Sequence, residues 1–351
     1  MILITARVGR MKKTNKLVSA FIALTVLASC SSSNDSTTAN ESSTETTIDS
    51  VVAELPVVAV TYSVIGDIVS QLVGDNASVN VVIPDGQDPH EFQPSAKDIE
   101  TINNAALVVS NGLEFEEGLE EVLENIADSS GNIFMIGEHI TVRKTEDGDE
   151  HGDDHGDDHG DEEEDEEEDE DHAEEEGDEH GDEHGGGDPH LWLSPATMLE
   201  MLPALTSALS EAIGADLTES SASLTAKLQD LDKEVESIIS SLGECNLVSG
   251  HDEMGYFADR YGCEVIGVII PSFTTTSEAT AGDIAELKEK VEQSNVPAIF
   301  TGLGVSPDTA TQLAKELDIK AVTLSTHFLD GAANYQAFML KMVNQIAEAL
   351  G

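Results

Sequence analysis

A long amphipathic segment divides this chain into two similar halves. From Leu217 to Leu242, apolar residues recur at helical spacing. At 1.5 Å per residue a helix of this length would span about 40 Å, the width of a domain. On either side of it, short apolar runs alternate with helical patterns, which is typical of βαβ units with a mostly parallel sheet. We therefore predict an α/β fold with two Rossmann-like lobes joined by one long rigid helix.

The expected elements follow from the same patterns. In the first half, strands are expected at 56–61, 79–84 and 106–110, and helices at 62–73, 95–103, 115–127 and 195–212. In the second half, strands are expected at 246–249, 265–270, 298–300 and 321–324, and helices at 254–261, 284–293, 307–317 and 335–350. The predicted domains are an N-terminal lobe at 55–213, a linker helix at 214–243 and a C-terminal lobe at 244–351.

A low-complexity tract interrupts the first half. Residues 146–188 hold 27 of the chain's 70 acidic residues and six of its 11 histidines, with no Lys or Arg. A segment this charged cannot bury a core, so we predict a disordered, solvated loop at 145–187. Two roles are open for this loop: it is either a solubilising spacer or a low-affinity metal loop. The ligands of a metal loop would be His151, His155, His159, His172, His180 and His184.

The charge balance excludes some partners. The formal net charge is −54, and outside the tract 43 acidic residues still face 16 basic ones. Nucleic acid is excluded because phosphate binding needs clustered Lys and Arg, whereas an acidic surface attracts cations. No Gly-rich phosphate loop lies at a strand–helix junction, so nucleotide binding is not supported.

The N-terminal segment has the pattern of an export signal. Basic residues precede the apolar stretch 17–28. At its end, the residues Leu27-Ala28-Ser29-Cys30 resemble the lipobox of a bacterial lipoprotein. We predict a signal peptide at 1–30, lipidation of Cys30 and a Ser/Thr-rich tether at 31–54. The protein would then be exported and lipid-anchored to the membrane, facing the periplasm or the cell exterior. A plain secretory signal is the alternative, and Met11 is an alternative start to Met1.

Two further cysteines each precede an apolar run. Adjacent parallel strands would place Cys245 and Cys263 side by side, and an exported protein can close such a pair into a disulfide. Two buried thiols are the alternative. Metal ligation by these thiols is less favoured, because neither has a second Cys or His at the spacing of a zinc finger.

Four histidines outside the tract point to a metal site. His90, His251 and His327 each follow a predicted strand, and His190 lies directly after the tract. Loops at the carboxyl ends of parallel strands line the crevice where α/β proteins bind ligands. One such histidine could be an ordinary loop or core residue, but four divided between two lobes indicate a metal site in the interlobe cleft. His139, which leads into the tract, is expected to be a surface residue.

The sequences around these histidines resemble a transporter family. The segments 88–94 (DPHEFQP), 188–195 (DPHLWLSP) and 250–262 (GHDEMGYFADRYG) look like the three histidine motifs of the zinc/manganese solute-binding proteins of ABC transporters. Residues 111–114 (NGLE) resemble a segment that those proteins carry between the first two motifs. The resemblance covers 55–351 and implies two lobes bridged by a long rigid helix, with the metal between them. The family's zinc-specific branch often has a His- and acid-rich insertion before the second motif, as here.

The chain departs from the family at the fourth ligand. Manganese- and iron-type members add a Glu, which aligns here with Gly302, and an Asp, which aligns near 325–327. We choose His327 as the fourth ligand, with Asp330 or a water as the alternative. An additional imidazole favours Zn²⁺, which accepts tetrahedral nitrogen donors, whereas Mn²⁺ favours more oxygen ligands. The predicted metal ligands are therefore His90, His190, His251 and His327.

Carboxylates near the ligands have two expected roles. Asp252 and Glu253 are candidates for orienting the imidazole rings from outside the ligand set, or else for a solvated helix start. Asp88 and Asp188, each two residues before a histidine, are expected to turn or cap their loops.

The resemblance implies an extracytoplasmic receptor that captures Zn²⁺ and delivers it to an ABC transporter permease. We expect a monomer that is not an enzyme and for which Zn²⁺ is the transported ligand. The alternatives are a manganese- or iron-binding receptor of the same family, and a metal-dependent adhesin or metallochaperone. A metallohydrolase is disfavoured, although Glu253 could serve as its base, because His-Glu-x-x-His is absent and four histidine ligands leave no position for water.

Overall fold

The computed structural model describes residues 54–144, 187–294 and 296–351. The predicted signal peptide, the lipidation site Cys30, the tether and the acidic tract with its six histidines lie outside the described residues. The described part of the chain belongs to one compact unit, Ala53–Gly351. Within it, no helix is long and apolar enough to cross a membrane.

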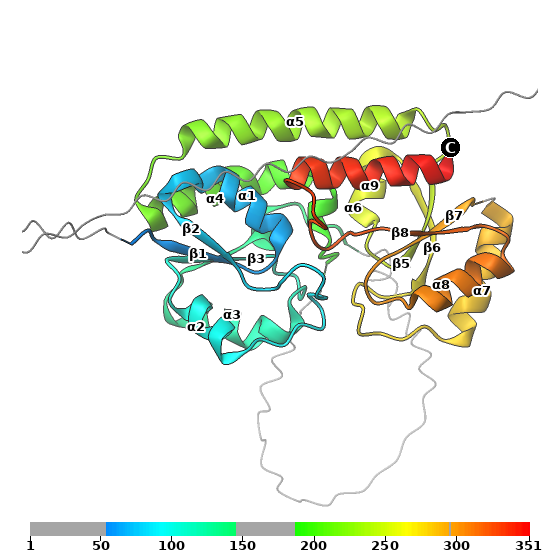
Figure 1. Cartoon of the computed structure of the whole chain (residues 1–351), viewed down its shortest axis with the longest axis horizontal. Coiled ribbons are helices and arrows are strands. Elements are labelled where there is room, and N and C mark those ends of the chain that lie inside the picture. The colour runs from blue at the N-terminus through cyan, green and yellow to red at the C-terminus, as the bar shows by residue number, and fades with distance from the viewer. Residues whose placement is uncertain (1–53, 145–186, 295) are drawn as a thin grey trace, which may run out of the picture. The chain divides into compact units, whose positions relative to one another are not determined.

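Two parallel sheets organise the described residues (Figure 1). The first, on which the N-terminal lobe is built, has the order β2-β1-β3-β4. The second, on which the C-terminal lobe is built, has the order β6-β5-β7-β8. The strand bounds are β1 Val57–Val60, β2 Ser78–Val81, β3 Leu107–Ser110, β4 Ile133–Met135, β5 Asn246–His251, β6 Glu264–Ile270, β7 Ala298–Thr301 and β8 Lys320–Thr323. The predicted α/β fold with two parallel sheets is thus confirmed.

Both sheets have the same topology, and this topology positions a site. The first strand of each lobe is central, and the chain then adds one strand on one side before crossing to the other. Such a reversal leaves a crevice at the carboxyl ends of the central strands, where loops diverge and ligands bind. The crevice lies beyond β1 in one lobe and beyond β5 in the other.

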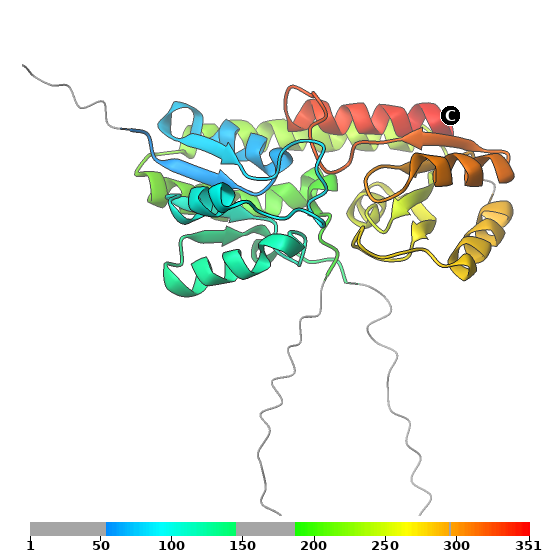
Figure 2. The same ribbon diagram turned by 60° about the horizontal axis from the view of Figure 1, so that its bottom comes forward.

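Helices cover both faces of each sheet (Figure 2). Buried apolar residues on these helices and on the strands form the cores, the largest of which runs from Val58 to Ala349 and includes parts of both lobes. The helix bounds are α1 Ser63–Val73, α2 Ala96–Asn103, α3 Glu120–Ser129, α4 Pro195–Ile213, α6 Gly255–Tyr261, α7 Ala281–Ser294, α8 Pro307–Glu316 and α9 Tyr335–Leu350.

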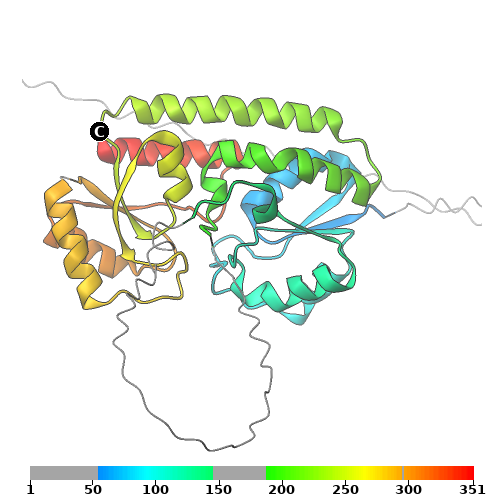
Figure 3. The same cartoon turned by 180° about the vertical axis from the view of Figure 1, so that it is seen from behind.

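The predicted long helix is α5, Thr218–Ser240. Its buried residues recur at helical spacing, and the helix packs against α4 and α9; they are Leu224, Leu228, Leu231, Val235 and Ile239. Figures 1 and 3 show α5 and α9 running side by side. The first turn of α9 contacts α1 of the N-terminal lobe. There the backbone N–H of Tyr335 donates to the side chain of Asp67 at 2.8 Å. Two helices therefore join the lobes, where the sequence predicted one; the residue boundaries predicted for the lobes stay predictions.

One predicted helix starts later than expected, and one strand was not predicted. The helix expected at 115–127 is a short 3-10 turn, η2 (Glu117–Leu119), followed by α3. Glu116 has φ −98° and ψ 63°, outside the helical region, so a helix that starts at residue 115 cannot continue through it. Strand β4 was missed because it is only three residues long and offers no period to detect.

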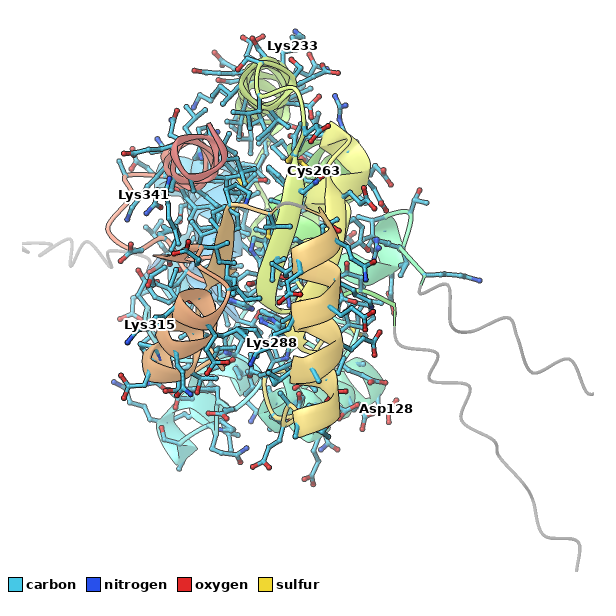
Figure 4. All side chains as sticks on the ribbon, turned by 90° about the vertical axis from the view of Figure 1, so that its right-hand side faces the viewer. Asp128, Lys233, Cys263, Lys288, Lys315 and Lys341 are labelled. Carbon is cyan, nitrogen blue, oxygen red and sulfur yellow. A yellow bond between two sulfur atoms is a disulfide. The ribbon has the colours of Figure 1, made fainter. Side chains whose placement is uncertain are left out.

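Cys245 and Cys263 form a disulfide. Each residue directly precedes a strand, and because β5 and β6 pair in parallel, their first residues lie next to each other. Cys263 is labelled in Figure 4. The bond fixes the edge of the second sheet at the amino ends of its strands, the side of the sheet opposite to the predicted crevice.

Candidate metal centre

The four histidines predicted as ligands lie together. Each offers one ring nitrogen, and the four atoms lie within 4.8 Å of one another. All four residues are at most 2% exposed. His90 and His190 come from the N-terminal lobe and His251 and His327 from the C-terminal lobe, so the group spans the cleft. Such a group could hold a metal ion.

His90 is positioned by the loop between β2 and α2. Its backbone N–H donates to Asp88 Oδ1 at 3.1 Å, so Asp88 turns this loop as predicted. The far end of the loop is fixed by a capping box at the start of α2, in which Ser95 and Asp98 satisfy each other's backbone N–H groups. Nδ1 of His90 lies 3.6 Å from Glu117 Oε1.

His190 is held by Asp188, which has a larger role than the sequence suggested. Asp188 Oδ1 accepts the backbone N–H of His190 at 2.9 Å, as a loop-turning residue would. The same oxygen lies 3.0 Å from Nδ1 of the His190 ring, so it also orients the imidazole. Asp188 is fully buried and its other oxygen lies 3.4 Å from the guanidinium of Arg143. The sequence predicts such orientation for Asp252 or Glu253 and only a turn for Asp188.

His251 is the last residue of β5, whereas the sequence placed it in the loop beyond a strand ending at residue 249. The longer strand brings its ring into the crevice, with Nε2 only 3.2 Å from Nε2 of His190. Nδ1 of His251 faces Glu253 Oε1 at 3.9 Å. Glu253 is buried, in keeping with the predicted orienting role, while Asp252 donates its backbone N–H to Ser272 at 3.0 Å.

His327 occupies the fourth position. Its Nδ1 lies 2.9 Å from Thr326 Oγ1, and that hydroxyl donates to Glu253 Oε2 at 2.6 Å. Among the described residues its Nε2 has no hydrogen-bond partner. Asp330, the alternative fourth ligand, lies outside the group and forms an ion pair with Lys341, which is labelled in Figure 4.

Gly302, which aligns with the Glu ligand of manganese- and iron-type members, has no room for a side chain. A Cβ at Gly302 would lie 2.8 Å from the carbonyl oxygen of Leu324. Any side chain there would force the backbone after β8 to move. The packing around Gly302 therefore has no space for a carboxylate ligand at this position.

The oxygens nearest to the four Nδ1 atoms lie outside the group. Nδ1 of His190 lies 3.0 Å from Asp188 and that of His327 lies 2.9 Å from Thr326. Nδ1 of His90 and of His251 lie 3.6 and 3.9 Å from Glu117 and Glu253 and have no hydrogen-bond partner among the described residues. A proton on Nδ1 leaves the lone pair of Nε2 free for a metal. Zn–N bonds of about 2.0–2.1 Å place tetrahedral nitrogens roughly 3.4 Å apart. The His190–His251 pair, at 3.2 Å, is already near this spacing.

Burial keeps the imidazoles neutral. It lowers the pKa of His90 to about 4 and that of His251 to about 3. The pKa values of His190 and His327 also lie well below the usual range, through burial and through the neighbouring imidazoles. Neutral imidazole is the form that binds metal. Burial conversely raises the pKa of Asp188 to about 7 and of Glu253 to about 8, and a bound divalent cation would offset the cost of ionising them.

Aromatic side chains form one wall of the site. The Phe115 ring centroid lies 5.0 Å from that of His90, and the Trp192 ring lies 5.5 Å from His190. The left-handed segment 112–114 directly precedes Phe115 in this wall. Asn111 Nδ2 also donates to the carbonyl of Pro189 at 2.9 Å, which joins this segment to the motif of His190. The resemblance marked these residues, but their contacts were not predictable from the sequence.

His139 is exposed, as expected for a surface residue. Its ring stacks on Phe134 with a centroid distance of 4.3 Å, and it is not part of the histidine group.

Replacing Asp188 with Asn should lower zinc affinity by about 10- to 100-fold, the usual cost of losing an outer carboxylate partner. The amide keeps the size of the side chain but removes the charge that faces both the His190 ring and Arg143. Competition with a chromophoric chelator measures the change. Asp259→Asn is the matched control, because Asp259 also contacts Arg143 but is largely exposed. A change of less than threefold in Asp188→Asn would contradict the assigned role.

Comparison with known proteins places this geometry in a family. Residues 58–349 match the family described as ZnuA, zinc-uptake complex component A, periplasmic. The manganese-binding lipoprotein MntA of Halalkalibacterium halodurans is 22% identical over 306 residues, which cover 84% of this chain and 88% of that protein. The zinc-binding protein AdcA of Streptococcus pyogenes serotype M3 is 28% identical over 76% of this chain; the match spans 50% of AdcA.

The comparison also includes a relative named for iron and a solved structure. The iron ABC transporter lipoprotein MtsA of Streptococcus pyogenes serotype M6 is 26% identical over 97% of this chain and 99% of its own. The periplasmic zinc-binding protein TroA of Treponema pallidum superposes with a TM-score of 0.68 at 22% identity, covering 85% of this chain and 99% of TroA. At that identity the superposition shows the shared fold alone.

The family match extends over most of the chain and includes all four clustered histidines. MntA and AdcA are named as metal-binding proteins and MtsA as the substrate-binding lipoprotein of an iron ABC transporter; none of the three names is that of an enzyme. The chain therefore belongs to the ZnuA family of metal-binding, substrate-binding proteins of ABC transporters.

Proposed function

We propose that this protein is an extracytoplasmic receptor that captures Zn²⁺ and delivers it to an ABC transporter permease. The family supports metal delivery, while its named relatives bind zinc, manganese or iron. The choice of zinc rests on one observation, which is that the four clustered donors are all neutral imidazole nitrogens. Zn²⁺ accepts such a tetrahedral set, whereas Mn²⁺ favours carboxylate oxygens and a larger coordination number.

In this proposal His90, His190, His251 and His327 bind the transported ion through Nε2. Asp188, Glu253, Thr326 and Glu117 orient the rings by facing their Nδ1 atoms. Two of the ligands come from each lobe, so zinc would tie the lobes together, and release requires them to separate. A manganese- or iron-binding receptor is the alternative; its oxygen ligands would have to come from outside this group.

The proposal includes export and anchoring. Several relatives are named lipoproteins, which supports lipidation of Cys30 and cleavage of the signal peptide just before it, so that Cys30 becomes the first residue of the mature protein. The acidic tract would bind additional zinc weakly through its six histidines. The protein would act as a monomer at the membrane surface, beside the permease.

The test is a metal titration of a soluble form that starts at residue 54 and lacks residues 146–187. The structure favours this deletion, because the backbone N–H of Asp188 donates to the carbonyl of Arg143 at 3.0 Å and so holds the two flanking ends together. We expect one tightly bound Zn²⁺ per protein, which excess Mn²⁺ does not displace. The form that retains the tract should bind further zinc ions more weakly.

Two results would contradict the proposal. A preference for Mn²⁺ in direct competition would favour the alternative receptor. Absence of a tight site after removal of the tract would mean that the four-histidine group is not the binding site.

A further inference from the structure

One of the four residues that place an oxygen near a histidine Nδ1 differs from the others in its exposure to solvent. Asp188, Glu253 and Thr326, which face three of the rings, are buried. Glu117, which faces Nδ1 of His90, has a side chain 36% exposed, while the His90 side chain is 1% exposed. The solvent edge of the site therefore lies at Glu117, on the η2 turn of the N-terminal lobe.

A loop of the C-terminal lobe reaches this edge. Thr274, between β6 and α7, donates its hydroxyl to Oε1 of Glu117 across the cleft. This is the same carboxylate oxygen that lies 3.6 Å from His90 Nδ1. One oxygen of Glu117 thus faces a predicted ligand in its own lobe and bonds the opposite lobe.

The loop that carries Thr274 is also attached to the site. The carbonyl of Ser272 accepts the backbone N–H of Asp252, the residue after His251, at 3.0 Å. The ring of Phe273 lies 6.4 Å from that of His190. The Ser272 hydroxyl accepts the backbone N–H of Thr274 at 3.2 Å, which sets the direction of the Thr274 side chain. These contacts hold the hydroxyl at the place where the lobes meet.

We propose that Glu117 and Thr274 form a latch across the cleft, which is coupled to the bound metal through His90 and limits the rate at which the metal leaves. This inference rests on the proposed metal-receptor function and adds to it a structural element that controls the rate of metal release. Glu117 is a positioning residue in this scheme, because it acts on the metal through His90 and is not itself a ligand.

The coupling follows from the chemistry of imidazole. A metal on Nε2 of His90 keeps the proton on Nδ1, which then donates toward Glu117. The present 3.6 Å separation is just beyond hydrogen-bond length, so a small movement of either side chain completes the bond. Glu117 would then be held by both His90 and Thr274, and the lobes could not separate at this edge without breaking a hydrogen bond to a charged group.

The latch is tested by kinetics as well as by affinity. Thr274→Val removes the cross-cleft hydroxyl at nearly constant volume and leaves the four histidines in place. Zinc release into excess chelator, followed by stopped flow, should accelerate roughly tenfold, the change expected for loss of one hydrogen bond to a charged group. Because opening also admits the ion, association should accelerate too, and equilibrium affinity should fall less than the release rate rises.

Glu117→Gln should accelerate release and also weaken affinity, because it removes the charge that faces His90. The double variant should release zinc no faster than Glu117→Gln alone, because both changes break the same connection. Glu91→Gln is the matched charge control, since Glu91 is exposed and adjacent to His90 in the sequence. Thr276 is unsuitable as a control, because its hydroxyl lies 2.9 Å from that of Thr274. Ser277→Ala is the control for loss of a hydroxyl from the same loop, since Ser277 is half-buried and belongs to neither side of the latch.

The possible outcomes separate the two proposals. Zinc binding by the unaltered protein is measured first, and absence of a tight site there would overturn the proposed function and the latch with it. Tight binding with a release rate in Thr274→Val within twofold of the unaltered protein would overturn the latch alone. Equal acceleration in Ser277→Ala, or additive effects in the double variant, would also overturn it.

Discussion

Replacement of His190 with alanine is expected to lower zinc affinity by at least roughly a thousandfold, well beyond the 10- to 100-fold cost of losing an outer partner. His190 contacts the whole group, since its ring centroid is 5.0 to 5.7 Å from those of the other three histidines. Its removal would delete one ligand and leave the buried Asp188 without its imidazole partner.

The measurement is a chelator competition with the tract-deleted protein, so that weak binding to the tract does not mask the loss. His139→Ala is the control, because His139 is an exposed histidine outside the group and should bind zinc normally. Near-normal affinity in His190→Ala would remove this residue from the ligand set and, with it, the proposed geometry.

The same series tests the choice of fourth ligand. His90→Ala and His251→Ala should resemble His190→Ala, whereas a water could partly replace the ring lost in His327→Ala. Asp330 is a poor substitute because it is paired with Lys341 at the surface. Unchanged affinity in His327→Ala would mean that the fourth ligand was misassigned.

The sequence was most informative where a local pattern decides the structure. Alternating apolar runs predicted both parallel sheets, and helical spacing from Leu217 to Leu242 predicted α5. The four histidines could be selected because three of them follow strands and their motifs resemble a known family. In parallel sheets the carboxyl ends of central strands meet at one edge, so residues far apart in sequence become neighbours for a simple topological reason.

The sequence was least informative about contacts between motifs. Nothing in the spacing of Asp188 shows that one of its oxygens serves both the backbone and the ring of His190. Glu117 and Thr274 are 157 positions apart and meet only after both lobes have folded. The start of α3 was misplaced because Glu116, which follows the left-handed residues Leu113 and Glu114, has a non-helical backbone, and none of these residue types favours such conformations. Such conformations are imposed by tertiary contacts, here including those of Asn111.

Replacement of Trp192 with alanine should destabilise the metal-free protein by about 3–5 kcal/mol, the usual cost of emptying a large buried aromatic site. Trp192 is fully buried and packs against Tyr62 and Phe115, with ring centroids 5.0 and 4.7 Å away. Its Nε1 donates to the carbonyl of Thr326 at 2.6 Å, so the ring also connects the two lobes beside His327.

Zinc affinity should fall with stability in this variant, because Trp192 supports two ligands from opposite lobes. Its ring lies 5.5 Å from that of His190 and 5.6 Å from that of His327. Urea unfolding should be followed by circular dichroism, since Trp192 is the chain's single tryptophan and the substitution removes that fluorescence. A chelator must be present, because residual zinc would stabilise the folded state and hide part of the loss.

Trp192→Phe separates packing from hydrogen bonding. Phenylalanine retains much of the contact with Tyr62 and Phe115 but leaves the buried carbonyl of Thr326 without the indole donor, at a cost of about 1–3 kcal/mol. If both variants lose zinc affinity equally, the hydrogen bond to Thr326 positions His327. If only the alanine variant loses zinc affinity, His327 is positioned by packing against the aromatic wall and not by the hydrogen bond. A loss of stability below about 1 kcal/mol in Trp192→Ala would contradict both, because a ring with these contacts cannot be removed from a close-packed interior at so small a cost.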